Sequence, residues 1–320
     1  MRPRPAAGTG LLLALLSAVT FATSGTFARS LIEAGWSAEA VVVARVGIAA
    51  LVLLGPAVLA LRGRWRVLRR NLGPVVVFGL LGVALAQACF FNAVRYLPVG
   101  VALLLEYLGI ILVVGWMWLV HGHRPRRLTV AGSVTALAGL VFVLDLTGAG
   151  RVDPVGVLWG LGAAVGLAGY FVLAGRVDDR LPSVTMASGG MAVGAAVLAL
   201  LGLVGVLPLR ATFGEVTFAG QRTSWLLPIA GLSLIAAVVA YLAGIAATRV
   251  LGSRLASFVG LTEVMFAVLI AWVFLGELPT VVQLLGGVLI VAGVALVRVD
   301  ELRTPPVESA EERADQPALT

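Results

Sequence analysis

Ten long apolar stretches follow one another through this chain, most of them separated by very short connections. They cover 10–30, 39–61, 73–91, 97–120, 128–145, 154–175, 182–206, 226–246, 252–275 and 281–298. Stretches of about 18 or more apolar residues are long enough to cross a bilayer as helices. With 60% apolar and 12% charged residues, the chain is also far more apolar than ordinary soluble domains. We therefore expect an all-α integral membrane protein with ten transmembrane helices.

Several kinds of chemistry are excluded by the residues that the chain lacks. Its basic residues are 23 arginines and no lysine, which excludes a Walker A phosphate loop and any lysine imine. A single cysteine, Cys89, excludes an internal disulfide. The two histidines, His121 and His123, fit no zinc-binding spacing. We therefore expect no metal and no cofactor.

The arginines predict the orientation of the chain. With the N-terminus inside the cell, 17 arginines fall on inner segments and five on outer ones, and Arg45 lies within a span. This bias predicts that both termini are cytoplasmic, in a multi-pass protein of the plasma membrane. Segment 1–9 is then a cytoplasmic N-terminus, and 299–320 a disordered acidic tail. The longest loop, 207–225, lies outside and carries turn signals. The net charge of +7 follows from this topology, so we expect no nucleic-acid partner.

The two halves of the chain repeat each other at an offset of 154 residues. Placing 92–143 on 246–297 gives 13 identities in 52 positions, including a tryptophan, a glycine and a proline of one motif. Each half, 10–145 and 154–298, then holds five spans. Because five is odd, the second half enters the membrane from the opposite side. Such inverted repeats are typical of secondary transporters, although duplication also occurs in membrane proteins with other roles.

The sequence resembles the EamA-type transporters of the drug/metabolite transporter superfamily. The resemblance covers 10–298 and is carried by the doubled five-helix unit, by Arg45 in the second span, and by the similar motifs that begin at Leu105 and Leu261. The first motif has His123 at the position that corresponds to Glu277, where the family often has Glu. The resemblance implies a ten-helix carrier with a central cavity and export of small metabolites.

Three ionisable residues lie well inside spans, where charge is costly and is usually functional. Counted along each helix, Glu106 is about 14 Å deep, Glu263 about 18 Å and Arg45 about 9 Å. Each half contributes one central acid, and paired acids suit a cationic amino group or an exchangeable proton. The alternative for Glu106 and Arg45 is a structural ion pair.

Weaker candidates are polar uncharged residues that can donate or accept hydrogen bonds within spans. These are Gln87, Asn92, Tyr107, Tyr170, Tyr241 and Thr262. The alternative for each is a hydrogen bond between helices.

Together these features predict a secondary active transporter that works by alternating access and exports small organic metabolites such as amino acids. Proton coupling is implied by the resemblance and by the two acids. The expected partners are the metabolite and the bilayer, and a homodimer stays open. An integral-membrane enzyme is one alternative, but the chain has no catalytic signature. A receptor or structural membrane protein is the other.

Overall fold

The computed structural model describes residues 7–97, 99–122, 125–144, 153–176, 180–275, 278 and 280–302. In these residues ten helical stretches are long and apolar enough to cross a membrane. They coincide with the ten apolar stretches of the sequence, so the predicted class of ten-helix membrane protein is confirmed. Most of the predicted disordered tail lies outside the described residues, as does most of segment 1–9.

The first five spans are built from eight α-helices and one π-helical segment. These are α1 (Ala7–Ala22), α2 (Ser24–Glu33), α3 (Ala38–Ala60), α4 (Trp65–Phe78), η1 (Gly79–Leu85), α5 (Ala86–Ala93), α6 (Val99–Tyr107), α7 (Gly109–His121) and α8 (Arg127–Leu144).

The last five spans are built similarly, with a short β-hairpin between the second and third of them. The elements are α9 (Pro154–Arg176), α10 (Ser183–Leu203), β1 (Glu215–Phe218), β2 (Gln221–Ser224), α11 (Leu226–Ser233), η3 (Leu234–Val239), α12 (Ala240–Leu251), α13 (Ser253–Gly260), α14 (Thr262–Leu275) and α15 (Val281–Leu302).

Helix interruptions occur at matching places in the two halves. The π-helical segments of spans three and eight end at Leu85 and Val239, which are 154 residues apart. Spans four and nine each break for one residue, at Leu108 and Leu261. Local π-helix and mid-span breaks leave backbone groups outside the regular ladder and are frequent at functional sites. Span one also breaks, at Thr23, whereas span six is continuous.

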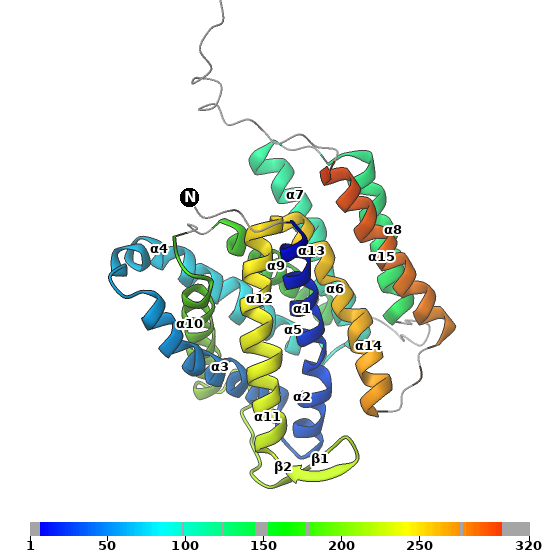
Figure 1. Cartoon of the computed structure of the whole chain (residues 1–320). Helices are drawn as coiled ribbons and strands as arrows, with labels where there is room; N and C mark the ends of the chain where they lie inside the picture. Colours follow the sequence, from blue (N-terminus) through cyan, green and yellow to red (C-terminus); the bar gives the residue numbers. More distant parts are fainter. Residues whose placement is uncertain are drawn as a thin grey trace, which may run out of the picture.

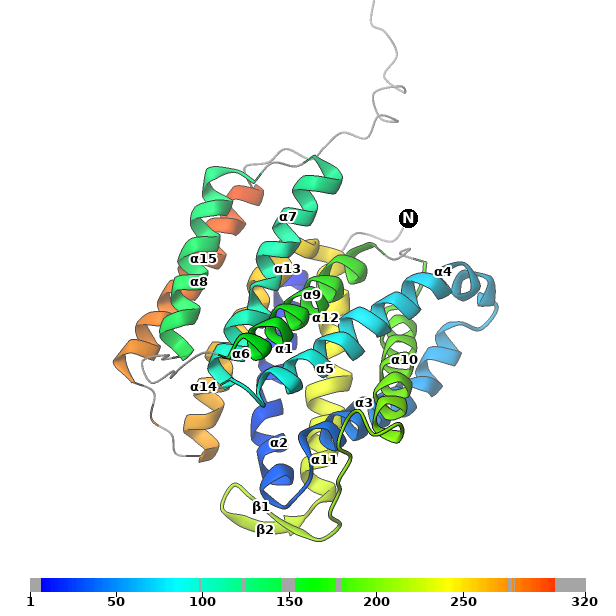
Figure 2. The same ribbon diagram turned by 180° about the vertical axis from the view of Figure 1, so that it is seen from behind.

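Helices α8 and α15 lie side by side on one flank of the molecule (Figures 1 and 2). Their contact is made by glycines: a Cβ on Gly139 would lie 2.6 Å from the carbonyl oxygen of Gly286, and a Cβ on Gly286 would lie 2.6 Å from that of Gly139. Gly132 and Gly293 meet in the same reciprocal way. The two helices are therefore antiparallel, and their backbones approach as closely as small residues permit.

A structured cap covers the end of the bundle that carries the β-hairpin (Figure 1). The hairpin turns at Ala219 and Gly220, whose φ angles of 50° and 76° are those of a two-residue turn. The indole nitrogen of Trp36 donates to the carbonyl of Thr212 at 2.6 Å, and the Ser37 hydroxyl donates to that of Pro208 at 2.6 Å. The predicted loop at 207–225 is thus fixed to the turn between α2 and α3.

Candidate functional site

The two acids predicted from the sequence flank the breaks in spans four and nine. Glu106 is the second-last residue of α6, and Glu263 is the second residue of α14. Both residues are partly exposed although they lie in the middle of their spans. The breaks therefore place one carboxyl from each half beside backbone that has left the regular helix.

The structure brings the two acids together through Tyr107. The Tyr107 hydroxyl interacts electrostatically with the carboxyls of both Glu263 and Glu106. Glu106 and Glu263 also interact electrostatically. Two like charges repel each other, so each carboxyl affects the charge of the other.

Arg45 lies in the middle of α3, with 7% of its surface exposed. Its Nη2 donates to the carbonyl of Ala236 at 2.5 Å, within the π-helical segment η3. The guanidinium also lies over the Phe21 ring, 5.7 Å from its centroid. Among the described residues no carboxylate lies within 4.0 Å of it, and it interacts electrostatically with Tyr241 and Glu263. Within the described residues Arg45 therefore forms no structural ion pair with Glu106.

A chain of aromatic rings connects Arg45 to the core. Phe21 contacts Tyr241 with 5.2 Å between centroids, and Tyr241 meets Tyr170 edge to face at 5.6 Å. Tyr170 in turn contacts Phe78 and Phe171. These rings come from α1, α4, α9 and α12, so both halves build this wall of the site.

Three buried polar atoms around these rings have no hydrogen-bond partner within the described part of the chain. They are the Tyr170 hydroxyl, the Nε of Arg45 and the Ser24 hydroxyl next to the break of span one. A buried polar atom is costly unless water or a ligand binds it. Arg45 and Tyr170 therefore carry hydrogen-bonding groups that the described residues leave unsatisfied.

The remaining predicted residues are placed less favourably. The Thr262 hydroxyl donates to the carbonyl of Val259 at 2.7 Å, so it bridges the break of span nine. Asn92 donates to the carbonyl of Ala88 in its own helix at 2.8 Å. Gln87 lies partly exposed in α5, about a turn from Asn92. No described contact connects these three to the two acids.

Two features of the site were missed by reasoning from the sequence. One is the carbonyl of Ala236, which only the π-helical geometry presents to Arg45. The other is Phe21, because a phenylalanine in an apolar span carries no signal of its position. The surroundings of Arg45 therefore include a backbone carbonyl and an apolar ring, neither of which can be recognised as part of a site from the sequence.

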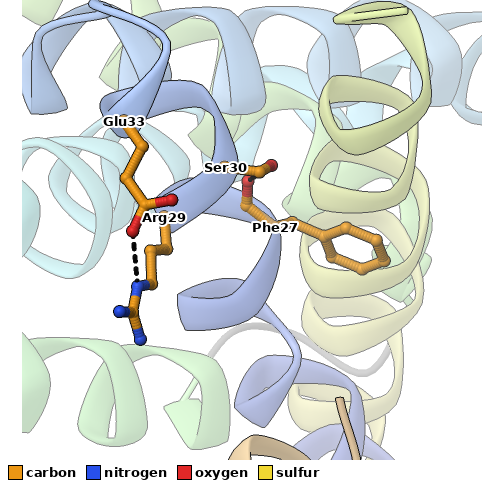
Figure 3. Close-up of polar contacts among 4 residues, drawn as sticks. All are labelled: Phe27, Arg29, Ser30 and Glu33. Carbon is orange, nitrogen blue, oxygen red and sulfur yellow. Dashed lines mark hydrogen bonds and ion pairs between the residues drawn. The ribbon is translucent and has the colours of Figure 1, made fainter. Parts of the chain in front are cut away.

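At the hairpin end, α2 forms a separate contact surface with the cap. Figure 3 shows Arg29 paired with Glu33 on α2, at 2.8 Å, and Ser30 bonded to the carbonyl of Phe27. The Phe27 ring stacks on Phe218 of the hairpin at 5.3 Å. The Arg29–Glu33 pair is exposed, so it stabilises the helix little.

Comparison with known proteins identifies the family. A family model, the EamA-like transporter family, matches twice, at 8–145 and at 154–299. The chain belongs to the EamA-like transporter family. It is therefore a membrane protein of a transporter family, as the sequence predicts.

Individual relatives agree with this assignment. The chain is 23% identical to YicL, an uncharacterized inner membrane transporter of Salmonella typhimurium, over 92% of this chain and 96% of the relative. It is 25% identical to YwfM, an uncharacterized transporter of Bacillus subtilis, over 74% of this chain and 77% of the relative. A solved crystal structure with 22% identity shares the fold, with a TM-score of 0.74 over 93% of this chain and 99% of that chain.

Proposed function

We propose that this EamA-like protein is a secondary transporter that exports small organic metabolites by alternating access, with a proton exchanged at the two acids. The observation that carries the proposal is the position of Glu106 and Glu263. Each lies at a mid-span break in the corresponding span of its half, and the two interact electrostatically. Ionisable groups at this depth usually belong to ion or proton pathways.

An inverted relation of the halves supports alternating access. Gly132 and Gly139 correspond to Gly286 and Gly293 at the offset of 154 residues, yet Gly132 contacts Gly293 and Gly139 contacts Gly286. This reciprocal antiparallel contact is what a two-fold axis in the membrane plane would produce. Halves related in this way can rock about a fixed midplane site and open to each side in turn.

The chemistry of the site favours a substrate that carries both an anionic and a cationic group. Arg45 and the Tyr170 hydroxyl offer donors for a carboxylate, and the two acids offer acceptors for an amino group. Amino acids and related compounds have both groups. With the termini in the cytoplasm, a proton entering from outside would drive such a substrate outward.

Counterflow in proteoliposomes tests this proposal. Vesicles containing the purified protein are loaded with unlabelled amino acids, and uptake of trace labelled amino acid is measured. We expect exchange by the wild-type protein, and loss of net proton-driven transport in Glu263→Gln, because glutamine keeps the shape and hydrogen bonding but cannot ionise. If Glu263→Gln still exchanges amino acids but no longer responds to a proton gradient, Glu263 is needed for proton exchange and not for substrate binding.

A double variant decides the role of the acids. If a folded Glu106→Gln/Glu263→Gln protein still transports with the wild-type dependence on a proton gradient, neither acid couples transport, and that part of the proposal fails. Thermal stability in detergent is measured beside the flux to show that the variants are folded.

A further inference from the structure

Five arginines gather where spans two and three meet, at the end of the bundle away from the hairpin (Figures 1 and 2). They are Arg62, Arg64, Arg66, Arg69 and Arg70, and all five are exposed. We call them the arginine patch. The distribution of arginines predicts that this end lies in the cytoplasm. That orientation needs only positive charge on the cytoplasmic side and no particular arrangement of the arginines. Two properties of the arginine patch are not explained by orientation alone: its lack of acidic partners among the described residues, and the exposed apolar surface next to it.

The patch has no acidic counterpart in the structure. No acid occurs in the chain between Glu39 and Glu106. The helices α9 and α10, which pack against α4 and η1, contain none either. Within the described residues none of the five arginines forms an ion pair, and Arg64 donates a hydrogen bond to the carbonyl of Ala60 in the preceding helix. Asp178 and Asp179 lie outside the described residues.

The patch continues the lipid-facing surface of both spans. On span three the exposed residues Leu80, Val76 and Leu72 follow one helical face, which continues to Arg69 and to the exposed ring of Trp65. Residues spaced by three or four positions share a face. An acyl chain along this face would therefore place its phosphate beside Arg69.

Span two contributes a second such face. Leu51, Leu54 and Val58 are exposed at helical spacing in α3, and the exposed Arg62 follows in the turn after that helix ends. Two apolar surfaces therefore converge on a single cluster of unpaired guanidinium groups. Tryptophan at such a boundary is typical of the headgroup region, as are arginines whose stems cover apolar surface.

We infer that the arginine patch is a binding site for anionic phospholipid, with the headgroup phosphate on Arg66, Arg69 and Arg70 and the acyl chains along spans two and three. Guanidinium groups bind phosphate through paired hydrogen bonds. Each arginine near an anionic headgroup strengthens binding about fivefold. A zwitterionic lipid of the same chain length would gain the apolar contact without this charge contribution.

Native mass spectrometry of the purified full chain tests the inference. The protein is equilibrated with equal amounts of phosphatidylglycerol and phosphatidylcholine that carry the same acyl chains. We expect the wild-type protein to retain phosphatidylglycerol preferentially. The Arg66→Gln/Arg69→Gln/Arg70→Gln variant should lose this preference by roughly tenfold or more.

A matched control removes three charges from the opposite end. Arg95, Arg210 and Arg222 are exposed, so their triple replacement by Gln changes the net charge equally. We expect this variant to bind lipid as the wild-type protein does. Equal retention of both lipids by the wild-type protein, or an equal loss of preference in both triple variants, would overturn the inference.

Two further measurements do not depend on the stability of the variants. Raising the salt concentration should abolish the preference of the wild-type protein, because about 1 M salt shortens the screening length to roughly 3 Å. Excess inorganic phosphate at constant ionic strength should not displace the lipid. Displacement by phosphate would show a site for free anions and contradict the assignment to lipid.

Discussion

Arg45 is the residue on which most interactions of the site converge. It donates to the carbonyl of Ala236, lies over Phe21 and interacts electrostatically with Glu263. A buried guanidinium is costly unless its partners are all present, because its desolvation is large. Arg45 therefore connects α3 to the π-helical segment η3, and its positive charge acts on the Glu263 carboxyl of the other half.

Replacing Arg45 and Glu263 together should destabilise the protein by less than the two single replacements predict when added. We expect Arg45→Gln to cost about 1–3 kcal/mol, because it removes the charged donor to the Ala236 carbonyl and the positive charge that acts on Glu263. In the Arg45→Gln/Glu263→Gln variant both charges are gone, and the loss should be smaller than the sum of the two single losses. Thermal unfolding in detergent measures all three variants. Strict additivity would show that the two residues are energetically independent.

The roles of the candidate residues were only partly readable from the sequence. Arg45, Glu106 and Glu263 were found because charge inside a span is rare and costly. The same reasoning could not separate Tyr107, which approaches Glu263, from Asn92, which bonds to its own helix. Both are polar residues in apolar spans, and only their direction around the helix distinguishes them.

At the scale of elements, the apolar pattern predicted ten spans but not their interruptions. A π-helical segment and a one-residue break keep the same apolar residues, so periodicity over spans three, four, eight and nine hardly changes. The hairpin was expected only as a loop with turns, because Gly220 suits its two-residue turn but Ala219, with a φ of 50°, is not a residue that signals one. These features arise from packing between halves, which a single sequence does not display.

The glycine contact between α8 and α15 can be tested with a matched control. A methyl group on Gly139 would meet the Gly286 carbonyl at 2.6 Å, so Gly139→Ala must push the helices apart. We expect a loss of about 1–3 kcal/mol in stability. Gly115 of α7 has nothing within 4 Å of its would-be methyl group, so Gly115→Ala should be nearly neutral. Similar unfolding temperatures for the two variants would contradict this account.

The hairpin should stabilise α2, the second part of span one. Phe218 stacks on Phe27, and Phe27 fits against Gly231 because a side chain there would collide with its ring. We expect Phe218→Ala to increase amide hydrogen exchange in α2, since the stacking contact is lost. The neighbouring Thr217 is exposed, so Thr217→Ala should leave exchange in α2 unchanged. Unchanged protection in Phe218→Ala would mean that α2 is stable without the hairpin.

At the scale of the whole molecule, the two halves share one design but differ in detail. Both have a π-helical third span and a broken fourth span, yet only span one of the first half breaks, at Thr23. The second part of that span, α2, carries the contact with the hairpin, whereas span six has no counterpart to it in the described residues. The two halves therefore share the interruptions of their third and fourth spans and differ at the cap.

The orientation of the molecule in the membrane is the last prediction. Seventeen arginines on one side against five on the other predict that the hairpin is outside and the arginine patch inside. The single native cysteine, Cys89, is buried and is first replaced by alanine. A membrane-impermeant maleimide added to intact cells should then label a cysteine at Thr217 and not one at Trp65, since both positions are exposed and lie at opposite ends. After the cells are made permeable, both should react. The reverse pattern would invert the molecule, move the arginine patch to the outer surface, and turn the proposed export into import.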